Sequence, residues 1–213
     1  YLSFLSGPLN VELQSELQEP ILFSHEVFPA YKRASVCAFR EVCTTALEQA
    51  HFAKNDMVFY RKADAKYMYF VNMGSLVYRA SKGTKESQTK HKLEAGHHCT
   101  ENALWMPWRH AGDMKALADC DLTLLNVSKF CEVTTRDYEA QHFARTYCRS
   151  FMARVQQVAS FDALAVTDLR LRVRVLSEES DLAGLGLWKG SGDGREAAVH
   201  LAPAAVDLKE AED

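Results

Sequence analysis

The spacing of apolar residues changes twice along the chain, and this change restricts the fold more than any other feature. Near the start, Leu9, Leu13 and Leu17 recur at helical intervals. Residues 46–78 are instead rich in aromatic and β-branched side chains and are repeatedly interrupted by turn residues. The helical interval then returns over residues 128–165. The pattern predicts an α+β fold with short antiparallel strands between helical segments.

The N-terminal helical part is expected to contain two helices. Pro8 is a helix-start signal, and Pro20 is expected to end the first run. After Pro29, apolar residues recur at intervals of three and four and predict a second helix between about Ala30 and Thr44.

The predicted strands are short and follow one another closely. Residues 81–92 are polar throughout and predict an exposed hairpin loop, with further strands over 93–98 and 116–127. This spacing is typical of a jelly-roll-like antiparallel β-roll, flanked here by N-terminal helices and long C-terminal helices. Turn signals within the first strand region fall at residues 54–56, 63–65 and 72–74.

Charge and glycine content divide the chain further. Residues 177–213 hold nine acidic and three basic residues, and five of the ten glycines lie between Gly184 and Gly194. This composition is typical of a flexible linker. Residues 169–175 alternate leucine or valine with arginine, which predicts an additional edge strand. We therefore expect four parts: a helical segment (1–44), a β-roll with C-terminal helices (45–165), an edge strand (166–176) and an acidic tail (177–213).

Several function classes are disfavoured. A net charge of −3 gives no general case for binding nucleic acid, and no apolar run approaches the roughly 20 residues of a membrane helix. Motifs of the common hydrolases, metalloproteases and kinases are missing, so we expect no enzyme, no catalytic residue and no cofactor. The six cysteines lack CxxC and zinc-site spacing, which predicts reduced thiols and no metal site. Because the sequence begins at Tyr1, we expect a piece of a longer protein.

Several segments together resemble the cyclic nucleotide-binding domain family over roughly residues 8–160. Most telling is the segment Leu93–Leu104, LEAGHHCTENAL, which is similar to the loop that leads into the family's phosphate-binding cassette. The supporting matches are the turn and strand at Asp56–Tyr60, the strand Lys66–Val71, and the glycine turn with its following strand at Gly74–Val77.

The resemblance implies a pocket for cAMP or cGMP. Glu101 opens the cassette and would accept a hydrogen bond from the ribose 2′-hydroxyl. Nine residues later the family has an arginine for the phosphate; His110 stands there, with Arg109 one place early. The predicted ligand contacts are Glu101, Asn102, Ala103, Arg109, His110 and Ala111.

Three departures predict that this pocket binds nucleotide weakly or not at all. Thr100 replaces a glycine, a neutral histidine attracts phosphate less than arginine, and the bulky Trp105 and Trp108 are expected on one helical face. An internal residue is then expected to fill the pocket. Candidates are Tyr147, Phe151 and the tail residue Trp188.

The N-terminal flank is similar to the helical approach found in voltage-gated potassium-type channels. The predicted function is therefore a regulatory domain of a cyclic-nucleotide-gated or voltage-gated cation (potassium) channel, on the cytoplasmic side of the membrane. Its partners would be the rest of the channel chain and neighbouring subunits, in a homotetramer. The alternatives are a soluble cyclic-nucleotide receptor or regulatory subunit, and a β-roll that binds no ligand and serves assembly.

Overall fold

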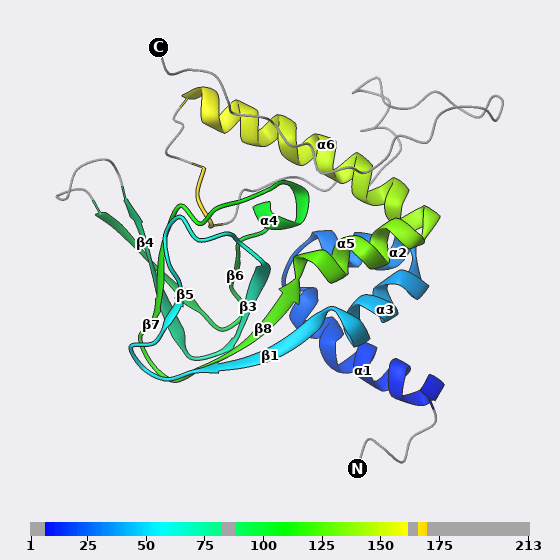
Figure 1. Ribbon diagram of the computed structural model, residues 1–213. Coiled ribbons are helices and arrows are strands. Elements are labelled where there is room, and N and C mark those ends of the chain that lie inside the picture. Colours follow the sequence, from blue (N-terminus) through cyan, green and yellow to red (C-terminus); the bar gives the residue numbers. More distant parts are fainter. Residues whose placement is uncertain (1–6, 82–87, 162–165, 170–213) are drawn as a thin grey trace. The chain divides into compact units, whose positions relative to one another are not determined.

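The computed structural model describes residues 7–81, 88–161 and 166–169, and it alternates helical and strand regions (Figure 1). The helices are α1 (Gly7–Leu22), α2 (Val27–Ala34), α3 (Val36–Thr45), α4 (Asn102–Trp105), α5 (Val127–Arg136) and α6 (Tyr138–Phe161). The strands are β1 (Leu47–Phe52), β2 (Met57–Phe59), β3 (Tyr67–Met73), β4 (Ser75–Ser81), β5 (Gln88–Glu94), β6 (His98–Cys99), β7 (Gly112–Ala116) and β8 (Cys120–Asn126). The predicted α+β class is confirmed.

The strands form two four-stranded antiparallel sheets. One has the order β1-β8-β3-β6 and the other β2-β7-β4-β5. A buried cluster contains side chains from both sheets, including Val71, Leu76, Met114 and Leu122, so part of the core lies between the sheets. This is the arrangement expected of a β-roll.

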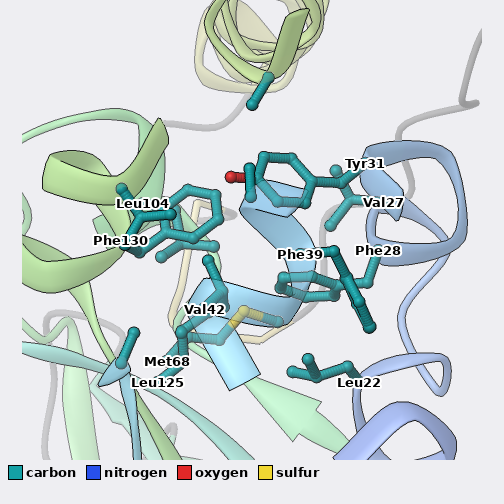
Figure 2. Packing of buried hydrophobic residues seen from close by; sticks show 14 of the residues in the cluster. Leu22, Val27, Phe28, Tyr31, Phe39, Val42, Met68, Leu104, Leu125 and Phe130 are labelled. Carbon is teal, nitrogen blue, oxygen red and sulfur yellow. The ribbon is translucent and has the colours of Figure 1, made fainter. Parts of the chain in front are cut away.

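The opposite face of the first sheet packs against the helices. Along β3, Tyr69 and Val71 belong to the cluster between the sheets, whereas Met68 and Phe70 belong to the helical cluster. Successive side chains of a strand point to opposite faces, so β3 contributes to both cores. Figure 2 shows the helical cluster, in which side chains from α2, α3 and α5 meet Met68 and Leu125 of the sheet.

Two predicted helix boundaries are corrected. The helix expected between about Ala30 and Thr44 is two helices, because Ser35 adopts an extended backbone and its hydroxyl accepts a hydrogen bond from the Ala38 amide. Ser35 is thus the N-cap of α3. The prediction that Pro20 ends the first helix was also wrong, since α1 continues to Leu22 with Pro20 inside its last turn.

The prediction for residues 81–92 was wrong in part. Residues 88–92 belong to β5, which pairs with β4 in the register Val77↔Lys92 and Arg79↔Lys90. Lys90 and Lys92 are exposed, which explains why this strand lacks an apolar pattern on one face. The strand expected over 116–127 is the end of β7 followed by β8.

Among the described residues, none of the helices combines the length and the apolar character that a membrane-spanning helix needs.

The glycine turn between β3 and β4 gives a first prediction. Gly74 has a φ of +88°, and a Cβ there would clash with the carbonyl oxygen of Asp119. Gly96 has a similar φ of +84°, but a Cβ there would meet no atom within 4 Å. Gly74→Ala is therefore expected to lower the free energy of unfolding by about 2 kcal/mol and Gly96→Ala by about 1 kcal/mol. Urea denaturation of both variants measures the difference, and equal losses would show that the contact with Asp119 is relieved without cost.

Candidate functional site

Residues 166–169 follow α6 in the chain and contact the β-roll; we name them the return segment. They place Asp168 in a pocket lined by hydrogen-bond donors. The Asp168 side chain is 0 % exposed. Its Oδ1 accepts hydrogen bonds from Trp108 Nε1 at 2.8 Å and His110 Nδ1 at 2.7 Å. Its Oδ2 accepts from the Tyr78 hydroxyl and the Ala111 amide, both at 2.8 Å, and from the Gly112 amide at 3.3 Å. Five donors thus converge on one carboxylate.

The backbone of the return segment is also bound. The Thr100 amide donates to the Asp168 carbonyl oxygen at 2.6 Å, and the Asn102 side-chain amide donates to the Thr167 carbonyl oxygen at 3.0 Å. Thr100 has a φ of +68°, a left-handed conformation that is unusual for a β-branched residue. The segment that begins at this residue, Thr100–Trp105, is named the cassette here, and it holds the return segment through Thr100 and Asn102.

Pro107 explains why Trp108 and His110 face the pocket. The helix α4 ends at Trp105, and Met106, which precedes the proline, is extended with φ −154° and ψ 156°. The residues after Pro107 lie along the 62–65 loop, where the His110 amide donates to Ala63 and its carbonyl accepts from Lys62. Adjacent side chains of such an extended segment point to opposite sides.

Arg109 consequently points away from the pocket. Its guanidinium lies 3.1 Å from Asp64 at the surface, and both side chains are about three-quarters exposed. The expectation that Trp105 and Trp108 share one helical face was wrong for the same reason, because Trp108 lies beyond the end of α4.

The Asp168 carboxylate is fully buried. This environment keeps the Tyr78 phenol protonated. Burial raises the pKa of the Tyr78 phenol, and the charge of Asp168 raises the same pKa further. Tyr78 therefore remains a donor to the carboxylate well above neutral pH. The ring of Phe59 stacks on that of His110 with a centroid distance of 3.7 Å, which fixes the orientation of the imidazole.

The raised pKa of Tyr78 predicts a loss of stability at alkaline pH. Below about pH 10, the ordinary tyrosine pKa, both folded and unfolded states keep the phenolic proton. Above it the unfolded state releases the proton and the folded state retains it, so the free energy of unfolding falls by about 1.4 kcal/mol per pH unit for this group. Burial of Tyr31 and Tyr69 raises their pKa values and adds to the decline.

Urea denaturation between pH 9 and 11 measures this slope. Tyr78→Phe is expected to make the slope shallower, and Tyr60→Phe, at a tyrosine that is 62 % exposed, is the matched control. If both variants kept the wild-type slope, the alkaline loss would have another origin.

A second carboxylate, that of Glu101 in the cassette, is bound by a separate set of side chains. Its Oε2 lies 2.8 Å from His25 Nε2, and its Oε1 accepts from the Tyr147 hydroxyl at 2.7 Å and from Trp105 Nε1 at 3.2 Å. His25 Nδ1 accepts a hydrogen bond from the Val27 amide, so the imidazole carries its proton on Nε2 and donates it to Glu101. Glu101 is 3 % exposed and therefore joins three elements: the α1–α2 connection, the cassette and α6.

The structure brings most of the predicted ligand residues together, but in other roles. His110, Ala111 and Asn102 contact the return segment, and Ala103 is buried in the cassette. Glu101 is bound by side chains of its own chain, and Arg109 lies at the surface. The role of these residues toward a nucleotide stays a prediction.

Asp168, which fills the pocket, is not among the residues predicted from the sequence. Tyr147 contacts Glu101 instead, Phe151 lies near Trp105 with a centroid distance of 6.5 Å, and Trp188 lies outside the described residues. The signal that could have indicated Asp168 was a lone acid between the last predicted helix and the arginine-rich alternation. Of the predicted edge strand, residues 166–169 form no strand, and 170–176 are outside the described residues.

Within the described ranges, no group of three or more histidine, cysteine, aspartate or glutamate residues could hold a metal ion.

Comparison with known proteins gives structural likenesses. No family model and no curated protein matches the chain. The regulatory domain of Toxoplasma gondii PKA, solved with cAMP, is similar with 18 % identity and a TM-score of 0.47, over 63 % of this chain and 50 % of that one. The EAL enzyme Bd1971, in a half-site-occupied form, is similar with 17 % identity and a TM-score of 0.43, over 51 % of this chain and 97 % of that one. The chain thus spans half the length of the PKA structure.

Proposed function

We propose that the chain is a cytosolic regulatory domain of a cyclic-nucleotide-gated or voltage-gated cation (potassium) channel, and that its cyclic nucleotide-type pocket is filled by its own return segment. The observation that carries the proposal is Asp168, buried and bound by five donors beside the cassette. Two of these donors, His110 and Ala111, are among the residues that the resemblance assigns to the nucleotide. The domain would therefore work without capturing cAMP or cGMP, by release and return of residues 166–169.

In this proposal, the cassette connects the pocket to the N-terminal helices and so to the rest of the channel. Thr100 and Asn102 hold the return segment, and Glu101 holds His25 between the N-terminal helices α1 and α2. These helices would lead to the pore and to neighbouring subunits of a homotetramer on the cytoplasmic side of the membrane. A state with the segment bound and a state with it released would then favour different arrangements of α1 and α2.

Calorimetric titration of the 213-residue chain with cAMP and cGMP tests the first half of the proposal. We expect no binding up to millimolar nucleotide, because the internal segment is held at a high effective concentration. Micromolar binding by the wild-type chain would overturn the proposal and favour a soluble cyclic-nucleotide receptor.

Current recordings from the complete channel test the second half. Asp168→Asn is expected to shift the gating equilibrium, because it weakens the return segment in one state, whereas Asp64→Asn at the surface is the matched control. Identical gating in both variants would contradict regulation through this pocket.

The filled pocket also favours a second candidate, a β-roll that binds no ligand and serves subunit assembly. This candidate predicts that the chain associates in a concentration-dependent manner in sedimentation equilibrium and that Asp168→Asn leaves gating unchanged.

A further inference from the structure

We infer that this pocket selects a carboxylate carried on a peptide backbone and does not accept a phosphate in its place. The inference rests on the proposed function and names the ligand class of the same site. In the folded chain the ligand is the return segment itself.

The arrangement of donors fits a carboxylate. A carboxylate offers two oxygens and about four lone-pair directions. Oδ1 of Asp168 receives two ring N–H groups, from Trp108 and His110, and Oδ2 receives the Tyr78 hydroxyl and two backbone amides. Both oxygens are thus fully used.

The charge of the site argues against phosphate. Proteins commonly bind phosphate through a guanidinium, which is a permanent cation with matching geometry. Apart from the imidazole of His110, the groups that touch the Asp168 carboxylate are neutral: an indole, a phenol and two amides. Arg109, the neighbouring cation in sequence, is turned outward to Asp64.

Two further contacts recognise peptide backbone. The Thr100 amide binds the Asp168 carbonyl oxygen, and the Asn102 amide binds the Thr167 carbonyl oxygen. Both acceptors are peptide carbonyls, and together with the carboxylate they form a pattern that an aspartate within a peptide presents.

Chemical rescue of Asp168→Ala tests this inference. The substitution removes a group of the size of formate and leaves the donors in place. In formate, compared with chloride at equal ionic strength and pH 7, we expect the folding equilibrium constant of this variant to rise about threefold when formate reaches twice its Kd. Inorganic phosphate and cAMP are expected to give no such rise.

Asp168→Asn is the matched control, because asparagine fills the same space and leaves no room for formate. If Asp168→Ala does not fold in chloride, the yield of folded chain after refolding in each salt gives the same comparison. Equal rescue by phosphate or cAMP would overturn the selectivity for carboxylate. No rescue by formate would show that Asp168 is a structural residue and that no carboxylate receptor exists here. Neither result bears on whether the wild-type chain binds cyclic nucleotide. The proposed function is therefore tested separately.

Discussion

Asp168→Ala is expected to lower the free energy of unfolding by about 3–5 kcal/mol, one of the two largest losses we predict for a single substitution in this chain. The substitution removes the common acceptor of five donors while the site remains closed from water. Buried donors without an acceptor lose their hydration without compensation, and this penalty exceeds the value of an ordinary hydrogen bond. The return segment would then leave the pocket, or the β-roll would lose its folded state at lower denaturant concentration.

Urea denaturation followed by tryptophan fluorescence measures this loss, since the Trp108 indole donates directly to Asp168. Asp64→Ala is the matched control: it also removes an aspartate from an ion pair in the same region, but that pair is largely exposed and its loss should cost below about 1 kcal/mol. A loss for Asp168→Ala as small as that for Asp64→Ala would mean that water replaces the carboxylate freely.

The fold could be predicted from the sequence because the buried residues of its two cores recur at the intervals typical of helices and strands. β3 alternates side chains between the inter-sheet cluster and the helical cluster, and α3 buries Phe39 and Val42 at a helical interval. The predicted helix boundaries were wrong where a single residue determines the local backbone conformation. Ser35 divides α2 from α3 by capping the latter, and Pro107 ends the cassette helix before Trp108.

The candidate site was predictable only in its position. Glu101 and its neighbours were located through the resemblance of this segment to a family's cassette, and their role toward a nucleotide stays a prediction. Asp168 lies 56 to 90 residues from its five donors along the chain, and only the folded backbone brings them together. Sequence spacing also could not show whether Arg109 or His110 contacts the pocket. The answer depends on which of these two adjacent side chains faces inward after Pro107.

The cassette has two sides with different partners. Thr100 and Asn102 bind the return segment, and the residues between and after them, Glu101 and Trp105, face α6 and the α1–α2 connection. The two sets of contacts therefore meet on one short segment. This arrangement allows the pocket and the N-terminal helices to be coupled over a few residues.

Glu101→Ala, the second large effect, is expected to cost about 3–4 kcal/mol. It leaves His25 Nε2, the Tyr147 hydroxyl and Trp105 Nε1 without their shared acceptor in a site that is 3 % exposed. Glu101→Gln keeps one acceptor oxygen and should cost about 1–2 kcal/mol. Glu48→Ala, which removes an exposed glutamate paired with Lys129, is the control and should cost below about 1 kcal/mol.

Amide hydrogen exchange of Glu101→Gln then distinguishes coupling from local damage. Loss of the His25 contact should speed exchange in the α1–α2 connection, because His25 also accepts the Val27 amide that begins α2. If the cassette couples its two sides, exchange should also become faster at the Thr100 amide, which donates to the Asp168 carbonyl oxygen. Faster exchange confined to the helices would mean that the return segment is held independently of Glu101, and regulation from the pocket to α1 and α2 would then need another path.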